Sequence, residues 1–239
     1  MKDQKLLNKA VPSMIWHSRD YRFNSLLALV FSGVFYLGVY YLSQVSGWFG
    51  SDPLLLLIWA LMLGMGLLLG TSMVVDVTVK DKLSHRLDFF LASGIDIKSL
   101  MLAYSLQMCR FSMVIPFALL MAFVFLPAFE LGFLSILGLF GSTAILVFMT
   151  ILYFNVLVLG QKHLKFVKYL LFISLNLLIY GMGSFSNQFL QFLANHHIAL
   201  SSLVLGLNVC LTLVLAGLLA LKWRHLSKEG VIRQEGTWS

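Results

Sequence analysis

Charged side chains are scarce in this sequence. Its 239 residues include 17 Lys or Arg and 10 Asp or Glu, which is 11% of the chain, while 59% is hydrophobic. Soluble globular proteins use about 25% charged residues, because polar groups must cover most of their surface. The composition therefore excludes an ordinary water-soluble domain, and it predicts an integral membrane protein whose outer surface faces lipid.

Other shortages exclude further classes of protein. The chain has 18 Gly and 4 Pro, which are too few for a collagen-like or a disordered chain. Its two cysteines, Cys109 and Cys210, lie inside apolar runs and are expected to act as small buried hydrophobes, so no disulfide framework is predicted. His196 and His197 are adjacent and would point in different directions on a helix, so we expect no metal site there.

Long stretches without charge locate the membrane spans. They cover residues 23–51, 53–75, 111–129, 131–161 and 169–221. Because about 20 apolar residues cross a bilayer as a helix, each of the first four holds one span and the last holds two, joined by a polar link at residues 184–198. We therefore predict an all-α fold with six transmembrane helices. Residues 1–239 form one transmembrane domain: a cytoplasmic or interfacial segment (1–23), the spans with their loops (24–221) and a cytoplasmic tail (222–239).

Basic residues indicate the orientation. Apart from Arg110, all of them lie in alternate segments, namely residues 2–22, 80–98, 162–168 and 222–233, and the segments between have none. The positive-inside rule places these four segments, and so both termini, in the cytoplasm of a multi-pass protein of the cell membrane. Since the basic residues are dispersed over short loops, no nucleic-acid partner is expected.

The segment before the first span mixes aromatic and charged residues. Met14, Ile15, Trp16, Tyr21 and Phe23 are mixed with His17, Arg19, Asp20 and Arg22. This composition is typical of an amphipathic elbow helix lying in the headgroup plane. It fits an ordinary aromatic and basic anchor beside a span equally well.

Residues 76–99 form the longest polar segment and are predicted to contain a cytoplasmic amphipathic helix between spans two and three. Leu83, Leu87, Phe90 and Leu91 recur at intervals of four, three and one, which gives one apolar stripe, and Gly94 is placed to end the helix. Such a helix either lies on the membrane or enters a groove on a partner protein.

Residues 81–100 resemble the cytoplasmic loop after the second span in permease subunits of type 2 ABC exporters. In that family a Gly-Thr-Leu-Glu-like core leads to a leucine run and a Ser-Pro-Ile-like break. The matching residues here are Leu87, Asp88, Leu91, Ala92, Ser93 and Ile95. The pattern differs at three positions, with His85 for glycine, Arg86 for threonine and Gly94 for proline. The resemblance extends to chain length, six spans, cytoplasmic termini, the elbow and the polar external segment.

The resemblance implies that this loop is a coupling helix seated on an ATP-hydrolysing subunit. Leu87, Phe89, Phe90 and Leu91 would then make apolar contacts, and Arg86 and Asp88 polar ones. The chain has no Gly-x-x-x-x-Gly-Lys-Ser/Thr motif, so we expect no cofactor in it, with ATP and Mg bound by partner ABC ATPase subunits. One set of six spans would form half of the path, so a second copy or a similar permease is expected as a further partner.

Two membrane features are interpreted in two ways each. Arg110, early in the third span, either extends to the inner headgroups or lines the translocation path, since a buried charge needs compensation. Phe185, Phe189 and Phe192 follow a helical spacing beside polar residues in the external link. They predict either a short helix that dips into the outer leaflet, which the resemblance implies is an external lid on the exit, or a turn in the aromatic belt.

No catalytic motif is found in the sequence. It lacks Gly-x-Ser-Gly and His-Glu-x-x-His, and the spans contain no Asp or Glu, so we do not expect an enzyme. We expect a permease subunit of an ATP-driven exporter that moves an amphipathic or hydrophobic substrate, such as a peptide, a drug or a lipid-like molecule, out of the cytoplasm. The alternative is an ion-coupled secondary transporter or channel subunit, for which Asp76 is the nearest carboxylate.

Overall fold

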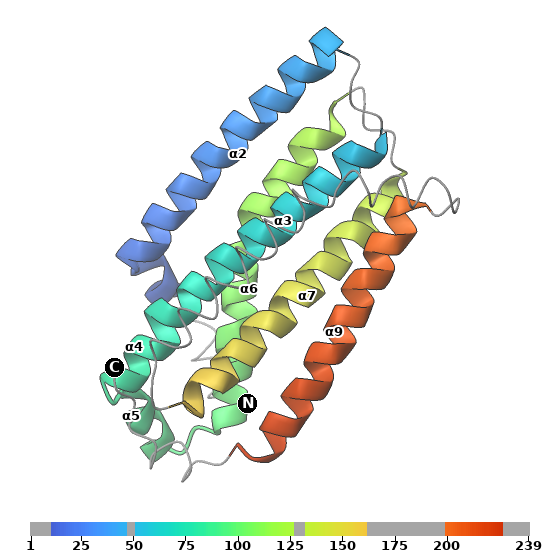
Figure 1. Ribbon diagram of the computed structural model, residues 1–239. Helices are drawn as coiled ribbons and strands as arrows, with labels where there is room; N and C mark the ends of the chain where they lie inside the picture. The colour runs from blue at the N-terminus through green and yellow to red at the C-terminus, as the bar shows by residue number, and fades with distance from the viewer. Residues whose placement is uncertain (1–10, 47–50, 127–131, 162–198, 227–239) are drawn as a thin grey trace.

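The computed structural model describes residues 11–46, 51–126, 132–161 and 199–226. Within these ranges the chain is helical and contains no strand (Figure 1). A short helix covers residues 11–17. The longer elements are α2 (Arg19–Ser46), α3 (Ser51–Met73), η1 (Val74–Val79), α4 (Lys80–Leu83), α5 (Arg86–Ala92), α6 (Ile97–Val124), α7 (Phe133–Leu159) and α9 (Leu200–Arg224).

Five helical stretches are long and apolar enough to cross a membrane. They are Arg19–Tyr41, Leu54–Leu83, Ile97–Val124, Phe133–Leu159 and Leu200–Arg224. The prediction of an all-α fold is confirmed for the described residues, and the length and composition of these five helices support a membrane-embedded protein. The remaining predicted span, the first of the two in residues 169–221, lies outside the described residues.

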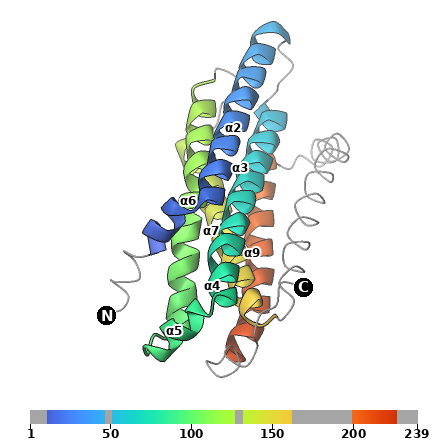
Figure 2. The same ribbon diagram turned by 90° about the vertical axis from the view of Figure 1, so that its left-hand side faces the viewer.

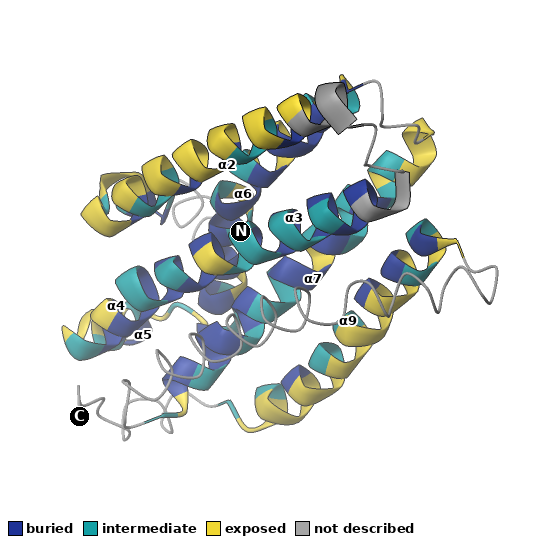
Figure 3. Cartoon of the chain, turned by 45° about the horizontal axis from the view of Figure 1, so that its top comes forward, coloured by how far each residue is buried: buried dark blue, intermediate teal, exposed yellow. Residues whose placement is uncertain are grey.

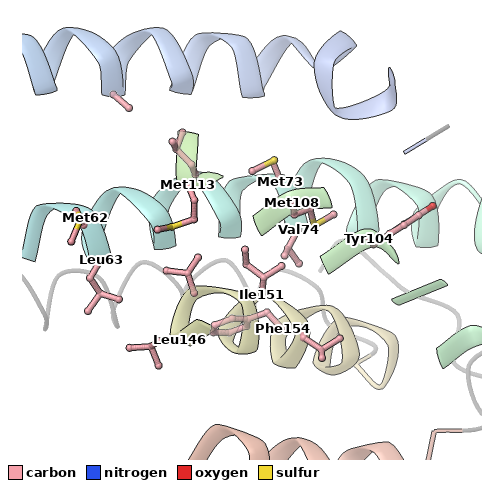
Figure 4. Close-up of a cluster of buried hydrophobic side chains, with 14 of the residues drawn as sticks. Met62, Leu63, Met73, Val74, Tyr104, Met108, Met113, Leu146, Ile151 and Phe154 are labelled. Atoms are coloured by element: carbon pink, nitrogen blue, oxygen red, sulfur yellow. The ribbon is translucent and has the colours of Figure 1, made fainter. Parts of the chain in front are cut away.

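The core forms where α3 packs between α6 and α7. Figure 4 shows Met73 of α3, Met108 of α6 and Ile151 of α7 within this cluster, and all three side chains are fully buried. Glycine allows the close approach of α3 to α7, because a Cβ added at Gly70 would lie 2.5 Å from Cδ1 of Ile151. Small residues at such contacts are the usual basis of helix packing in membranes, where lipid tails are as apolar as leucine.

Helices α7 and α9 run in the same direction. Gly138 near the start of α7 lies beside Leu205 near the start of α9, and Asn208 Nδ2 donates to Ser142 Oγ at 3.0 Å one turn further along. Asn208 also accepts a hydrogen bond from the indole of Trp59 in α3 at 3.1 Å. The end of α7 and the start of α9 therefore lie at opposite ends of the bundle (Figure 1).

Helix α2 has the most exposed apolar surface. Its buried residues Tyr21, Ala28, Ser32 and Val39 form a narrow stripe facing the bundle, and most of the helix is exposed (Figure 3). The large exposed residues are leucines, valines, phenylalanines and tyrosines. A helix that is apolar on nearly all sides is stable only against other apolar groups. This surface therefore fits contact with lipid.

Candidate functional site

The candidate site is the segment that joins α3 to α6 at one end of the bundle (Figure 2). The sequence predicted one amphipathic helix there, and the structure divides it into α4 and α5. The first part continues α3 through the π-helical turn η1. The chain then breaks at Ser84 and His85 before α5 begins at Arg86.

His85 causes the break, because its backbone is left-handed with φ 56°. This conformation costs a residue other than glycine about 1–2 kcal/mol. The imidazole Nδ1 lies 2.9 Å from Asp88 Oδ2, an interaction that offsets part of the cost. In the family pattern that this loop resembles, glycine stands at the position of His85. Glycine is the residue that adopts this conformation most readily.

The end of α5 is as the sequence predicted. Gly94 has φ 90°, and the amide of Ile95 donates to the carbonyl of Phe90 at 3.3 Å, which is the hydrogen bond of a Schellman motif. Asp96 then starts α6 by accepting a hydrogen bond from the amide of Ser99 at 3.0 Å. Both caps fix the direction in which α5 leaves the bundle.

The two faces of α5 differ in exposure. Leu87 and Leu91 are buried against the bundle, Phe90 is half-buried, and Phe89 is 71% exposed. Phe89 contacts the ring of Phe90 edge-on, with their centroids 6.2 Å apart. Of the four apolar residues expected to contact a partner, Leu87 and Leu91 instead pack inward, and Phe89 is the one fully presented on the surface.

The two polar residues expected in the docking face remain accessible. The side chains of Arg86 and Asp88 are 53% and 40% exposed. Arg86 Nη1 lies 3.6 Å from Oδ1 of Asp81, a buried carboxylate that also accepts a hydrogen bond from the Tyr104 hydroxyl at 2.7 Å. Arg86 therefore connects α5 through Asp81 to α6.

Lys82 joins α4 to α7. Its side chain is buried, and Nζ donates to the carbonyls of Val158, Leu159 and Gln161 at 3.0, 2.9 and 2.7 Å. The last carbonyls of a helix have no partner within it, and the negative end of the helix dipole favours a cation. Three bonds use all the protons of an ammonium group, so this lysine is fully engaged in capping α7.

A buried polar network holds the π-helical turn. Thr78 donates from its hydroxyl to Oδ1 of Asn155 at 2.5 Å, and Nδ2 of Asn155 donates to Ser105 Oγ at 2.8 Å. The three residues belong to η1, α7 and α6, and all are fully buried. π-Helical turns are costly and frequently occur at functional positions. Together with Asp81 and Lys82, this network fixes the segment to two spanning helices.

A second polar cluster links η1 to the amino-terminal segment. Lys80 Nζ lies 3.1 Å from both Asp20 Oδ2 and Asp76 Oδ1, and the Ser18 hydroxyl donates to Asp76 Oδ2 at 3.3 Å. Asp76 is 7% exposed in its side chain, whereas Lys80 and Asp20 are largely exposed. The cluster therefore joins the start of α2 to the segment that leads to α5.

Arg110 lies on the exposed surface of α6, next to the point where the amino-terminal segment crosses it. Its neighbour Phe111 accepts a hydrogen bond from the Tyr21 hydroxyl at 3.4 Å and contacts the ring of Trp16 at 6.3 Å. No ion pair to Arg110 is present within the described part of the chain. The predicted lid residues Phe185, Phe189 and Phe192, with His196 and His197, lie outside the described residues.

The sequence did not reveal the buried polar groups that hold this segment. Asp81 and Lys82 resemble solvated loop charges, and only their contacts with α6 and α7 make them buried. Asn155 could have been noticed, because it is a single amide in a long apolar run. Among the residues that the structure describes, no group of His, Cys, Asp and Glu is placed to hold a metal ion.

Comparison with protein-family models, with curated proteins and with solved structures finds no match for this chain.

Proposed function

We propose that this chain is the permease subunit of an ATP-driven ABC exporter, with α5 as the helix that docks on a separate ATPase. The observation that carries the proposal is the contrast within α5. Phe89 is 71% exposed at the tip of the bundle, whereas Leu87 and Leu91 of the same short helix are buried. An exposed aromatic ring on a firmly held helix is typical of a residue that fills a pocket on a partner.

The connections of the segment support transmission of force. A movement of a docked partner reaches the membrane only if the docking helix is rigidly joined to the spans. Here α4 continues α3 through η1, Asp81 is bonded to Tyr104 of α6, and Lys82 is bonded to the end of α7. A displacement of Phe89 would therefore be carried to three helices together.

The proposal includes six spans with both termini in the cytoplasm. Because α7 and α9 run in the same direction, the connection over residues 162–198 begins and ends at opposite ends of the bundle, which supports one further crossing in it. Residues 11–17 would form the interfacial elbow. Val11 and Ile15 are buried against the bundle, and Trp16 and His17 are exposed, as expected of a helix lying at the inner surface of the cell membrane.

The partners follow from this assignment. ABC ATPase subunits would bind ATP and Mg, and a second copy or a similar permease would complete the path. An amphipathic or hydrophobic cargo fits a bundle whose described core contains few ionisable groups, with a peptide, a drug or a lipid-like molecule as the candidates.

The second candidate is an ion-coupled secondary transporter or a channel subunit. It is favoured by Asp76, a carboxylate with 7% exposure in contact with the Ser18 hydroxyl. The neighbouring Lys80 compensates its charge at 3.1 Å, which supports a structural ion pair more than an ion-coupling site.

The test compares two variants that place the same charge in the loop. The protein is purified in mild detergent from its native cells, and we expect an ATPase with a Walker motif to remain bound and to hydrolyse ATP. Phe89→Asp should release that ATPase, because a charge replaces the exposed ring, whereas Ser84→Asp, at another exposed position of the loop, should retain it. A monodisperse wild-type preparation without an ATPase would favour the carrier or channel.

A further inference from the structure

An open groove lies between α6, α7 and α9 at the end of the bundle nearest α5. Its volume is about 460 Å³. Its apolar lining consists of Leu102, Met149, Leu152, Ala216, Leu219 and Ala220. Ala216 and Ala220 are four residues apart and so share one face of α9, where their short side chains leave room above the helix.

One end of the groove is aromatic and cationic, unlike its apolar body. Trp223 and Arg224 complete the lining, and Lys222 beside them is exposed. Ala216 and Arg224 are eight residues apart, so the groove follows α9 for about 12 Å. It therefore has an apolar body of that length, then an indole, and then a guanidinium.

The charges around the groove favour a ligand with a negative charge. No Asp or Glu of the described ranges lines it, and Arg224 has no ion pair with any described residue. Indole rings at the ends of spanning helices lie at the level of lipid headgroups. A guanidinium binds a phosphate through two parallel hydrogen bonds. A complementary ligand has an apolar chain joined to an anionic phosphate.

We propose that this groove binds an anionic phospholipid of the cytoplasmic leaflet, with one acyl chain along Ala216 and Ala220 and its phosphate on Arg224. The charge of the mouth decides against a zwitterionic lipid, because its own cation would lie near Arg224 and none of the described lining residues is a carboxylate. The site does not depend on coupling to an ATPase, and it would exist equally in a carrier or channel. The bound lipid bridges α7 and α9 where Met149 and Leu152 face Ala216 and Leu219.

Native mass spectrometry of the full-length protein in detergent tests the site. Phosphatidylglycerol and phosphatidylcholine with the same acyl chains are titrated separately. We expect one tightly bound phosphatidylglycerol and weaker phosphatidylcholine. One basic residue near a membrane surface contributes about 1 kcal/mol, so Arg224→Gln should weaken phosphatidylglycerol binding about fivefold. Arg22→Gln, which removes an exposed basic residue of α2, should leave it unchanged.

Two further variants address the apolar body of the groove. Ala220→Leu fills it and should remove both the tight binding of phosphatidylglycerol and the weaker binding of phosphatidylcholine at this site. Since that variant can also disturb folding, fluorescence quenching by phosphatidylglycerol brominated on its acyl chains is measured on the wild type and on Trp223→Phe. The wild type should show a quenched component that Trp223→Phe lacks.

Three results would overturn the proposal. One is equal effects of Arg224→Gln and Arg22→Gln, and another is tight binding that survives in a folded Ala220→Leu protein. The third is a Trp223 that brominated lipid does not quench, which would mean that another part of this chain or a second copy fills the groove.

Discussion

Lys82 Nζ lies 2.9 Å from the backbone carbonyl oxygen of Leu159, so a residue of the loop after α3 caps the end of α7. The two residues are 77 positions apart in the chain. Through this contact and the bond from Tyr104 to Asp81, the segment that carries α5 is fixed to two helices besides the one it continues. The position of Phe89 is thus set by the helices of the bundle, not by a free loop.

Replacing Lys82 tests the cap. Lys82→Met retains most of the apolar stem but leaves the carbonyls of Val158, Leu159 and Gln161 without their donor. Hydrogen bonds to charged groups contribute about 1.5–3 kcal/mol each, and burial of the ammonium offsets part of that sum. We expect the free energy of unfolding in detergent to fall by about 2–3 kcal/mol.

The control for that experiment is Lys98→Met, which removes a half-exposed lysine from the start of α6. Its effect should stay within about 0.5 kcal/mol, as for most surface substitutions. Equal losses for the two variants would show that the cap of α7 does not stabilise the fold.

The left-handed conformation of His85 predicts that glycine and valine at this position have different effects on stability. Glycine adopts φ 56° without strain, so His85→Gly should change thermal stability little, since relief of strain balances the lost contact with Asp88. A β-branched residue suits this conformation worst, and His85→Val should destabilise by about 1–2 kcal/mol. Thermal unfolding followed by circular dichroism measures both. A valine variant as stable as the glycine variant would contradict the backbone conformation of this break.

The contact of α3 with α7 predicts different effects for two glycines of one helix. A Cβ at Gly70 would lie 2.5 Å from Ile151 Cδ1, whereas one at Gly64 would meet nothing within 4 Å. Gly70→Ala should therefore cost about 1–3 kcal/mol through overpacking, and Gly64→Ala should be neutral or slightly stabilising. Unfolding in detergent compares them, and Ile151→Val should recover part of the loss at Gly70. Similar stability of the two alanine variants would mean that α3 and α7 are further apart.

Local patterns in the sequence were sufficient to predict part of this architecture. Apolar runs predicted the five described spanning helices, and Gly94 predicted the end of α5, because both depend on neighbouring residues alone. The break at His85 was missed, since the apolar stripe from Leu83 to Leu91 continues across it. The inward direction of Leu87 was missed for another reason: periodicity defines a face but does not say whether it meets the bundle or a partner.

The polar anchors could not be predicted in the same way. Asp81 and Lys82 are buried by contacts with α6 and with the end of α7. The residues that bond to them there are 23 to 79 positions away in the sequence. For Arg110, the contacts of Trp16 and Tyr21 with the adjacent Phe111 place it near the amino-terminal segment. Helix α6 begins at Ile97, so Arg110 lies near the middle of this helix and not early in it, and both its extension to the inner headgroups and its role in a translocation path stay predictions.

Photocrosslinking from position 89 in intact cells tests the central claim most directly. A photoreactive phenylalanine analogue replaces Phe89, and in a control protein it replaces Phe125, which is equally exposed near the opposite end of α6. Docking of α5 predicts an adduct between position 89 and a cytoplasmic ATPase with a Walker motif, and no such adduct from position 125. Adducts from position 89 with lipid or with extracellular proteins alone would contradict the account.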